Sequence, residues 1–259
     1  MSNDFEFNAN AADDFLKRGF SIVPQCLSQV NVARFIQLTE AARESSLSES
    51  AVANSSGVYA LRNLSEIVPE TVELLECAAV RTIVETILGP SAFLVRSTLF
   101  DKTEGANWGV FWHQDLSIAV EQRHDVNGFH SWTRKAGVDC VQPPVELMEQ
   151  ILTVRLHLDD CYAVKGALRV LPGSHQTKHL TSDEIAHQAA SSGETICEVP
   201  AGGAVLMRPM LLHASSPMER PGHRRVIHLE FAAFELPLPL KWRFRIPCNL
   251  KRNSESPLE

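Results

Sequence analysis

A polar triplet, His113-Gln114-Asp115, lies inside the largely apolar stretch from Asn107 to Val120 (NWGVFWHQDLSIAV), and its histidine and aspartate are two residues apart. A buried carboxylate needs a partner, because removing a charge from water is costly unless the charge is paired. A metal ion is one such partner, and imidazole and carboxylate groups are common metal ligands. Side chains two residues apart in a strand point to the same side. His113 and Asp115 are therefore a candidate pair of metal ligands.

A third ligand would have to come from a distant part of the chain. Non-haem Fe(II) oxygenases hold iron with two histidines and one carboxylate and leave the opposite face of the metal open. His213, in the segment LMRPMLLHASSP, is the candidate. The H-x-D pattern alone is weak evidence, because chance produces it often in a chain with 10 histidines. A second copy, His157-Leu158-Asp159, is interpreted as a strand face that runs into a turn.

The elements that must position these residues change character near residue 90. Residues 10–90 show mostly helical spacing, with Ser28 as a candidate N-cap and a helix that ends at Gly89. The Ser-rich segment 45–57 is predicted to be a loop. Beyond residue 90, short β-rich segments such as SAFLVRSTLF, ILTVRLHLD and RRVIHLEFAAF are bounded by Gly, Pro or Asn. This order favours a mainly β fold, a barrel or sandwich, with helices packed on one side.

One irregular insert, residues 121–149, interrupts the strands. A loop of that length in a compact domain is usually functional, often as a lid, or else disordered. The chain shows no linker and no internal repeat. We therefore expect a single domain over 1–259, with a helical part at 10–90 and a β core at 91–235.

Composition and charge exclude several kinds of partner. A formal net charge of −7 argues against nucleic acid and anionic membranes. No apolar run approaches the roughly 18 residues of a membrane span, and the acidic start lacks the features of a signal peptide. Six scattered cysteines without a CxxC pair predict reduced thiols in a cytoplasmic protein. No pattern indicates an oligomeric state.

Three longer segments together resemble the phytanoyl-CoA dioxygenase family. They are LFDKTEGANWGVFWHQDLSIAV, QPPVELMEQILTVRLHLDDCYAVKGALRVLPGSH and HASSPMERPGHRRVIHLEFA, and they occur in the order found in that family. The similarity covers roughly residues 10–245. The family is a branch of the Fe(II)/2-oxoglutarate-dependent oxygenases and has a double-stranded β-helix (jelly-roll, cupin-like) core. The resemblance implies that HQD, and not LHLDD, is the metal pair.

The resemblance also implies which residues hold iron and 2-oxoglutarate. His113, Asp115 and His213 would be the iron ligands, and Arg224, eleven residues after His213, would pair with the distal carboxylate of 2-oxoglutarate. A planar guanidinium suits this task because it binds a carboxylate through two parallel hydrogen bonds. Arg225 remains the alternative, since strand alternation allows only one of the two side chains to point inward.

Further contacts to the co-substrate follow from the same resemblance. Ser215 matches the H-x-S of the family and would donate its hydroxyl to the carboxylate. The other residues predicted to contact the co-substrate are Gln114, Thr98, Arg62 and Arg155. For Arg155 two interpretations stay open, a contact to co-substrate or substrate and a structural salt bridge. Its strand parity places it on one face with Thr153 and His157, a polar stripe that suits a barrel interior.

The substrate side is less well defined by the sequence. Trp112, Phe129 and Trp132 are candidates for the wall of a substrate pocket, and core packing is the alternative for each. His175, in PGSH, is interpreted as structural. The presence of Asp115 favours hydroxylation over halogenation, because the related halogenases carry a small residue in its place. The lack of a peroxisomal ending and of a phosphate-binding cluster favours a free small molecule over an acyl-CoA ester.

These observations predict an Fe(II)- and 2-oxoglutarate-dependent dioxygenase that uses O2 to oxidise a small organic molecule, with succinate and CO2 as co-products. Hydroxylation is the expected outcome, and desaturation or ring formation at the same centre are its alternatives. Two alternatives remain open. A zinc hydrolase on the same core would need a general base near the metal and would have no use for Arg224. A binding protein with an inactive site is the other.

Overall fold

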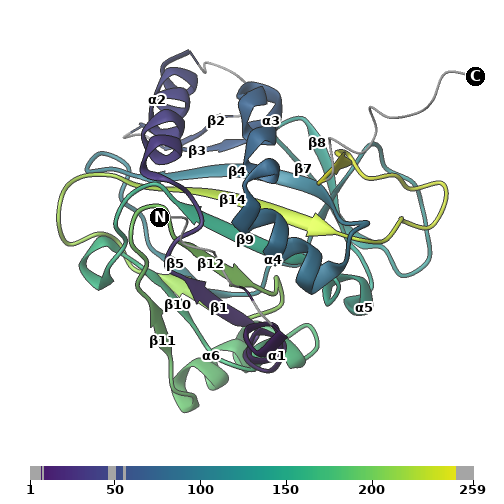
Figure 1. Ribbon diagram of the computed structural model, residues 1–259. Coiled ribbons are helices and arrows are strands. Elements are labelled where there is room, and N and C mark those ends of the chain that lie inside the picture. The colour runs from purple at the N-terminus through teal and green to yellow at the C-terminus, as the bar shows by residue number, and fades with distance from the viewer. Residues whose placement is uncertain (1–6, 8, 46–50, 55–56, 249–259) are drawn as a thin grey trace, which may run out of the picture.

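The computed structural model describes residues 7, 9–45, 51–54 and 57–248. Two antiparallel sheets form its core (Figure 1). The main sheet has the strand order β1-β12-β9-β14-β4-β3-β2, with β15 paired to β4. Its strands are β1 (Phe20–Val23), β2 (Ala51–Asn54), β3 (Gly57–Arg62), β4 (Phe93–Lys102), β9 (Leu152–His157), β12 (Ala204–Met207), β14 (Arg224–Ala232) and β15 (Ile246–Pro247).

A smaller sheet of order β11-β10-β13-β5 brings the two predicted metal-binding segments together. Its strands are β5 (Val110–His113), β10 (Leu168–Val170), β11 (Thr195–Cys197) and β13 (His213–Ser215). Strand β13 pairs with β5 so that His213 lies opposite His113. A third sheet consists of β6 (Ile118–Val120), β8 (Val138–Gln142) and β7 (His130–Lys135). The predicted mainly β fold with flanking helices is confirmed.

The two faces of the main sheet differ in chemistry because side chains alternate along each strand. On β14, Ile227, Leu229 and Phe231 belong to the largest apolar cluster of the molecule. Arg224 and His228, on the opposite face of the same strand, line a cavity. The apolar face is the one that the helices cover.

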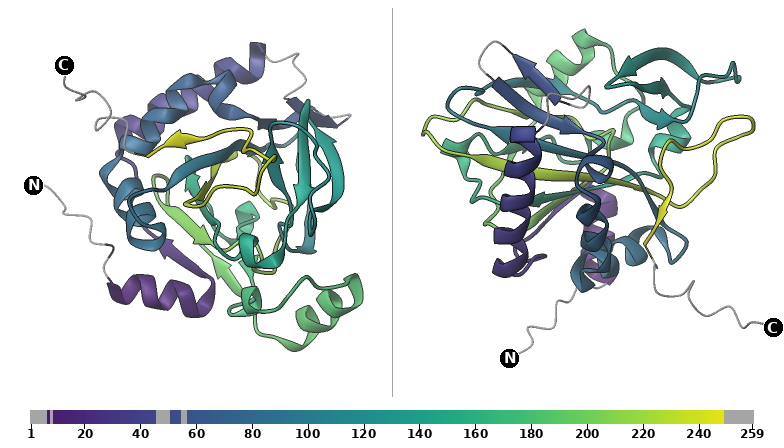
Figure 2. Two further views of the ribbon diagram at one scale, coloured as in Figure 1. Left: turned by 90° about the vertical axis from the view of Figure 1, so that its right-hand side faces the viewer. Right: turned by 90° about the horizontal axis from the view of Figure 1, so that it is seen from above.

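Helices from the first part of the chain pack against this apolar face (Figures 1 and 2). They are α1 (Ala9–Arg18), α2 (Gln29–Ser45), α3 (Leu64–Ile67), the 3-10 helix η1 (Pro69–Glu76) and α4 (Ala78–Leu88). Ser28 caps α2, as predicted, by accepting a hydrogen bond from the backbone N–H of Asn31 at 3.2 Å. The other described helices lie in later connections: α5 (Val145–Met148), η2 (Ala163–Lys165), η3 (Ser174–Gln176) and α6 (Ser182–Ser191). No described helix is long and apolar enough to cross a membrane.

Residues 10–90 are mostly helical, as predicted, but strands β1, β2 and β3 also lie there. The structure corrects the prediction of a loop over 45–57, because β2 lies inside that segment. Residues 46–50 and 55–56 of the segment lie outside the described part of the chain. Strands as short as β1 and β2 offer too few alternations for the pattern to be recognised.

The insert 121–149 is also more regular than predicted. It contains β7, β8 and α5. The strand β7 has the sequence HSWTRK and is exposed at five of its six residues, so it lacks the apolar alternation that marks a half-buried strand. The prediction that the insert acts as a lid stays a prediction.

Candidate metal centre and its cavity

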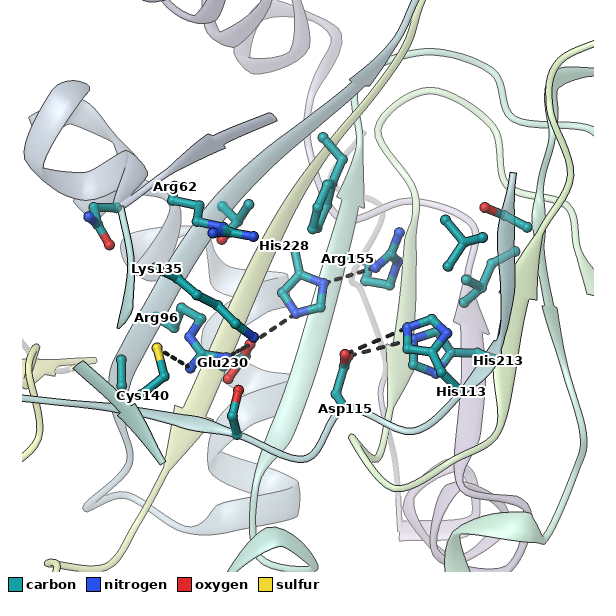
Figure 3. A pocket seen from close by; sticks show the side chains of 18 of the residues that line it. Arg62, Arg96, His113, Asp115, Lys135, Cys140, Arg155, His213, His228 and Glu230 are labelled. Carbon is teal, nitrogen blue, oxygen red and sulfur yellow. Dashed lines mark hydrogen bonds and ion pairs between the residues drawn. The ribbon is translucent and has the colours of Figure 1, made fainter. Parts of the chain in front are cut away.

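His113, Asp115 and His213 come together at one point of the small sheet (Figure 3). One ligand atom from each lies within 4.8 Å of the others. The Nε2 atoms of His113 and His213 lie 3.8 and 3.6 Å from the Asp115 carboxylate oxygens. A single ion with bonds of about 2.1 Å can bridge atoms at these separations. Within the described residues this is the one group of three or more side chains with the spacing of a metal site.

The orientation of both imidazoles is set by the backbone. The Nδ1 atom of His113 lies 2.8 Å from the carbonyl oxygen of Phe111, and Nδ1 of His213 lies 2.8 Å from that of Leu211. A carbonyl only accepts, so Nδ1 carries the proton in each ring. The lone pair of each Nε2 is therefore free for a metal, which is the arrangement that orients histidine ligands in metalloproteins. Asp115 is held by its backbone N–H, which donates to the carbonyl of Pro209 at 2.9 Å.

The electrostatics of the triad favour the forms that bind metals. Burial lowers the pKa of His213 to about 3, so its ring is neutral near pH 7. Burial raises the pKa of Asp115, but the neighbouring imidazoles of His213 and His113 lower it by more, to about 2. With the imidazole of His113, the neutral ring of His213 and the carboxylate of Asp115 supply the ligand types of the facial triad in non-haem iron oxygenases.

The triad lies in the wall of a cavity of about 240 Å³ between the two sheets and the insert. Strands β4 and β14 of the main sheet supply polar side chains to its interior, and β7 and β8 of the insert supply Lys135, Val138 and Cys140 (Figure 3). The insert therefore forms part of the cavity wall. Five lysine or arginine side chains face two carboxylates there: Arg62, Arg96, Lys135, Arg155 and Arg224 against Asp115 and Glu230.

Arg224 and Arg225 point to opposite faces of the main sheet, as strand alternation requires. Arg224 is buried in the cavity wall and donates to the carbonyl of Gly166 at 2.7 Å. Its Nε–H has no hydrogen-bond partner among the described residues, and burial lowers its pKa. Arg225 donates instead to the carboxylates of Asp159 at 3.0 Å and Glu40 at 2.9 Å. Of these two arginines, only Arg224 is thus available to a ligand in the cavity.

Ser215 lies at the same end of the cavity and has a partner that the sequence did not reveal. Its hydroxyl accepts a hydrogen bond from the ammonium of Lys102 at 3.0 Å, and Lys102 also donates to the carbonyl of Ser216 at 2.6 Å. Lys102 is fully buried. Burial, followed by repulsion from Arg224, lowers the pKa of Lys102 to about 7.

A chain of hydrogen bonds crosses the floor of the cavity from β9 to β4. Arg155 lies 2.9 Å from Nδ1 of His228, whose Nε2 lies 3.2 Å from the Glu230 carboxylate. Arginine only donates, so Nδ1 of His228 accepts and its Nε2–H donates to Glu230. The same carboxylate accepts a hydrogen bond from Arg96 at 3.1 Å. Arg155 lines the cavity and makes no ion pair with a described carboxylate, so the structure gives no support to the structural salt bridge, and contact with a ligand stays a prediction.

Two further predicted residues, Thr98 and Arg62, also line the cavity. They are neighbours across β3 and β4, and His228 lies opposite Thr98 on β14. The side chain of Arg62 makes no hydrogen bond or ion pair with any described residue, and the same holds for the side chain of Lys135 from the insert, although the backbone of each pairs within its sheet.

Four residues predicted for the site lie outside the cavity wall. The side chain of Gln114 points to the backbone, where it donates to the carbonyl of Met210 at 3.0 Å and accepts from Leu180 at 3.0 Å. Phe129 and Trp132 pack in or against an apolar cluster beside the insert. The guanidinium carbon of Arg169 lies over the ring of Trp112, 5.2 Å from the ring centre. The alternative of core packing agrees with the placement of Phe129 and Trp132, whereas Trp112 is half-buried and belongs to none of the apolar clusters of the described residues.

Several residues of the cavity wall escaped the sequence analysis. On β4 they are Arg96 and Phe100, on β14 His228 and Glu230, and Trp108 precedes β5. The sequence did contain a signal for the strand residues, because residues two apart point to the same face of a strand. Arg96, Thr98 and Phe100 follow this spacing on β4. On β14, Arg224, His228 and Glu230 follow it too, with Val226 as the one apolar residue between them.

The second H-x-D copy ends β9, and Asp159 binds Arg225 on the far side of the sheet. His175 contacts the backbone carbonyl of Leu16 through Nε2 at 3.0 Å and stays away from the triad. All six cysteines are free.

The family model for phytanoyl-CoA dioxygenase (PhyH) matches residues 15–226, most of the chain. The chain belongs to the phytanoyl-CoA dioxygenase family. The matched region includes the whole His-Asp-His triad and Arg224. No curated protein matches the sequence.

Solved structures with similar folds include several non-haem iron enzymes. The carbocyclase SnoK from nogalamycin biosynthesis, described as α-ketoglutarate-dependent, has a TM-score of 0.68 at 17% identity over 98% of this chain and 94% of its own. EctD from S. alaskensis with 2-oxoglutarate and 5-hydroxyectoine has a TM-score of 0.70 at 19% identity, over 90% and 78%. AviO1 from Streptomyces viridochromogenes Tue57 has a TM-score of 0.65 at 22% identity, over 88% and 96%. At these identities the similarity confirms the fold.

Proposed function

We propose that the protein is an Fe(II)- and 2-oxoglutarate-dependent dioxygenase that hydroxylates a small organic molecule. The observation that carries this proposal is the convergence of His113, Asp115 and His213 in the wall of a cavity that also holds Arg224, whose Nε–H has no partner among the described residues. Membership of the phytanoyl-CoA dioxygenase family supports it. So do neighbours in fold whose structures are described with bound iron and with 2-oxoglutarate.

The triad fits iron in its chemistry and in its exposure. Two imidazoles and one carboxylate occupy one side of the position where the metal would bind. The side chains of His113 and Asp115 are 37% and 34% exposed. A structural metal site would be closed by a fourth protein ligand. The described residues supply none within reach. Open positions are what an oxygenase needs for its co-substrate and O2.

The neighbouring end of the cavity fits a dicarboxylate. Arg224 and Arg155 each keep an Nε–H without a hydrogen-bond partner, although both groups are buried. Burial and the charge of Arg224 lower the pKa of Arg155 to about 10, so the two cations stay protonated near pH 7 and repel one another. A bound carboxylate removes this repulsion and satisfies the free donors. In this proposal Arg224 binds the distal carboxylate, with Ser215 beside it.

Bound iron and 2-oxoglutarate would supply the oxidising chemistry, with O2 consumed and succinate and CO2 released. The residues of the chain would position the reactants and exclude water. The insert walls the cavity with Lys135, Val138 and Cys140, and we propose that it limits solvent access as a lid. The presence of Asp115 supports hydroxylation, since the carboxylate occupies the position that a halide would need.

The test is a titration of the protein with Fe(II) and 2-oxoglutarate in the absence of O2. Chelation of iron by 2-oxoglutarate gives a weak visible charge-transfer band. We expect the band in the wild type, its loss in His113→Ala and its retention in His187→Ala, which removes an exposed histidine of α6. A zinc hydrolase or an inactive binding protein predicts no band in any variant. Release of succinate on admission of O2 then tests for turnover.

A further inference from the structure

The cavity has a second end, away from Arg224, whose charges the proposed co-substrate does not use. Arg62 from β3 and Lys135 from β7 line this part of the cavity together with Arg96 and Glu230 (Figure 3). Arg96 is paired with Glu230 at 3.1 Å. Arg62 and Lys135 have no such partner among the described residues. Two cations thus face the cavity without a counter-charge.

The register of the sheet separates these cations from the co-substrate end. Arg62 lies opposite Thr98, which lies opposite His228 on β14. His228 is four residues from Arg224, which corresponds to roughly 14 Å along the strand, and Arg62 is two strands away, roughly 10 Å across the sheet. One carboxylate of a molecule as small as 2-oxoglutarate cannot contact Arg224 and Arg62 together. Arg62 therefore cannot share the carboxylate that Arg224 binds.

The charges of the cavity remain unbalanced after the proposed cofactors are added. A ferrous ion with Asp115 carries a net single positive charge, and Arg224 adds another, which together offset the two negative charges of 2-oxoglutarate. Glu230 offsets Arg96. The positive charges of Arg155, Arg62 and Lys135 then have no counterpart in the cavity wall. Cations gathered in a cleft with low-dielectric walls attract anions.

We infer that the substrate carries an anionic group, a carboxylate or a phosphate, which Arg62 and Lys135 bind while the rest of the molecule extends toward the metal. This inference rests on the proposed function. Both cations lie at the rim of the cavity, Arg62 on the next-to-last strand of the main sheet and Lys135 on the insert. The anionic group is therefore held at the entrance, and the atoms nearer the metal are the ones to be oxidised. Arg62 and Lys135 act as specificity residues.

The pair Arg96–Glu230 lies at this second end, because Glu230 is two residues farther from Arg224 along β14 than His228, which is level with Arg62. The paired charges present a neutral surface, so a second anionic group gains nothing there. His228 donates to the same carboxylate and holds it in place. A substrate with one anionic group and an uncharged body matches two unpaired cations beside a neutral pair.

The experiment uses the full chain loaded with Fe(II) and 2-oxoglutarate without O2, so that the metal end is filled and no turnover occurs. The charge-transfer band confirms loading before the next step. The loaded protein is then dialysed against a defined mixture of carboxylates and phosphate esters together with amides, alcohols and amines of matched carbon skeleton. Mass spectrometry measures which compounds the protein retains.

We expect anions to be retained over their matched neutral analogues by about tenfold, the effect of a charge-assisted hydrogen bond. The ratio of carboxylates to phosphate esters identifies the anionic group. Arg62→Gln and Lys135→Glu should remove the preference and keep the charge-transfer band. Arg134→Gln, an exposed cation next to Lys135 on the same strand, and Arg81→Gln on α4 should keep both.

Three results would overturn the inference. They are a preference for amides or amines, no enrichment of any anion by a loaded protein, and an unchanged preference in Lys135→Glu. Absence of the charge-transfer band is a different result, because it refutes the proposed function before any compound of the mixture is added.

Discussion

The two ends of the cavity are built in different ways. At the metal end, the backbone orients each group: Phe111 and Leu211 hold the two imidazoles through their carbonyls, and Gly166 holds Arg224. At the other end, Arg62 and Lys135 come from a peripheral strand and from the insert and have no described partner. Groups that serve the same reactants in every turnover gain from a fixed geometry. The open end, with its unpaired charges, is where one substrate can be distinguished from another.

The largest effect is expected at the fixed end. Asp115→Ala removes the carboxylate that lies 3.6 and 3.8 Å from the two imidazoles. We expect iron affinity to fall by about 100-fold or more, because metal sites lose affinity steeply when a ligand is removed. Equilibrium dialysis with Fe(II) under anaerobic conditions measures this. Asp159→Ala is the control from the second H-x-D, and equal loss of iron in that variant would contradict the assignment.

Arg224→Ala tests the co-substrate side of the same end. Removing one partner of a buried charge pair costs about 2–5 kcal/mol, so the dissociation constant for 2-oxoglutarate should rise by roughly 30-fold or more while iron binding is kept. Arg225→Ala is the matched control: it breaks the ion pairs with Asp159 and Glu40 and should leave co-substrate affinity unchanged. Titration of the charge-transfer band measures both. If Arg225→Ala alone weakened 2-oxoglutarate binding, the assignment would move to that residue.

Glu230→Gln tests whether the open end depends on its buried ion pair. The change leaves Arg96 and His228 without the charge that both contact. We expect the free energy of unfolding to fall by about 3 kcal/mol, as for other buried pairs that lose one partner. Glu235→Gln removes an exposed partner of Arg245 and should cost less than about 1 kcal/mol. Urea denaturation measures both, and equal effects would show that burial of the pair is unimportant.

Lys102 provides the smallest effect, a dependence of stability on pH. Its pKa is lowered from 10.5 to about 7, mainly by burial. Between these two values the unfolded chain binds more protons than the folded one, so raising the pH stabilises the fold by about 1 kcal/mol per pH unit. Below pH 7 both states are protonated and this gain is absent. The difference in unfolding free energy between wild type and Lys102→Met, measured from pH 7.5 to 9, should show this slope, and a flat difference would contradict it.

The metal site was the part of the molecule that local sequence described best. H-x-D and H-x-S are short patterns, and their place in three family-like segments was enough to predict the convergence of His113, Asp115 and His213. The choice between Arg224 and Arg225 followed from spacing and alternation, and the two side chains do lie on opposite faces. The strands of the core were also predicted, since their apolar alternation is local.

The aromatic residues show where such reasoning stops. Trp112, Phe129 and Trp132 are near the metal motif in sequence, and none lines the cavity. Cavity residues come instead from strands that neighbour one another only in the folded sheet, as β4, β14 and β9 do. The polar strand β7 was predicted as irregular because nothing local distinguishes HSWTRK from a loop.

The amino-acid sequence by itself determined the family, the three residues that converge in the candidate metal centre and the inward-facing arginine. These depend on residue types at fixed spacings, which side-chain alternation converts directly into direction. Only the tertiary structure decided which cations find a counter-charge and which face the cavity alone. That outcome depends on distances between strands from remote parts of the chain. Whether two charged groups form an ion pair is decided by a difference of a few ångströms in the distance between them.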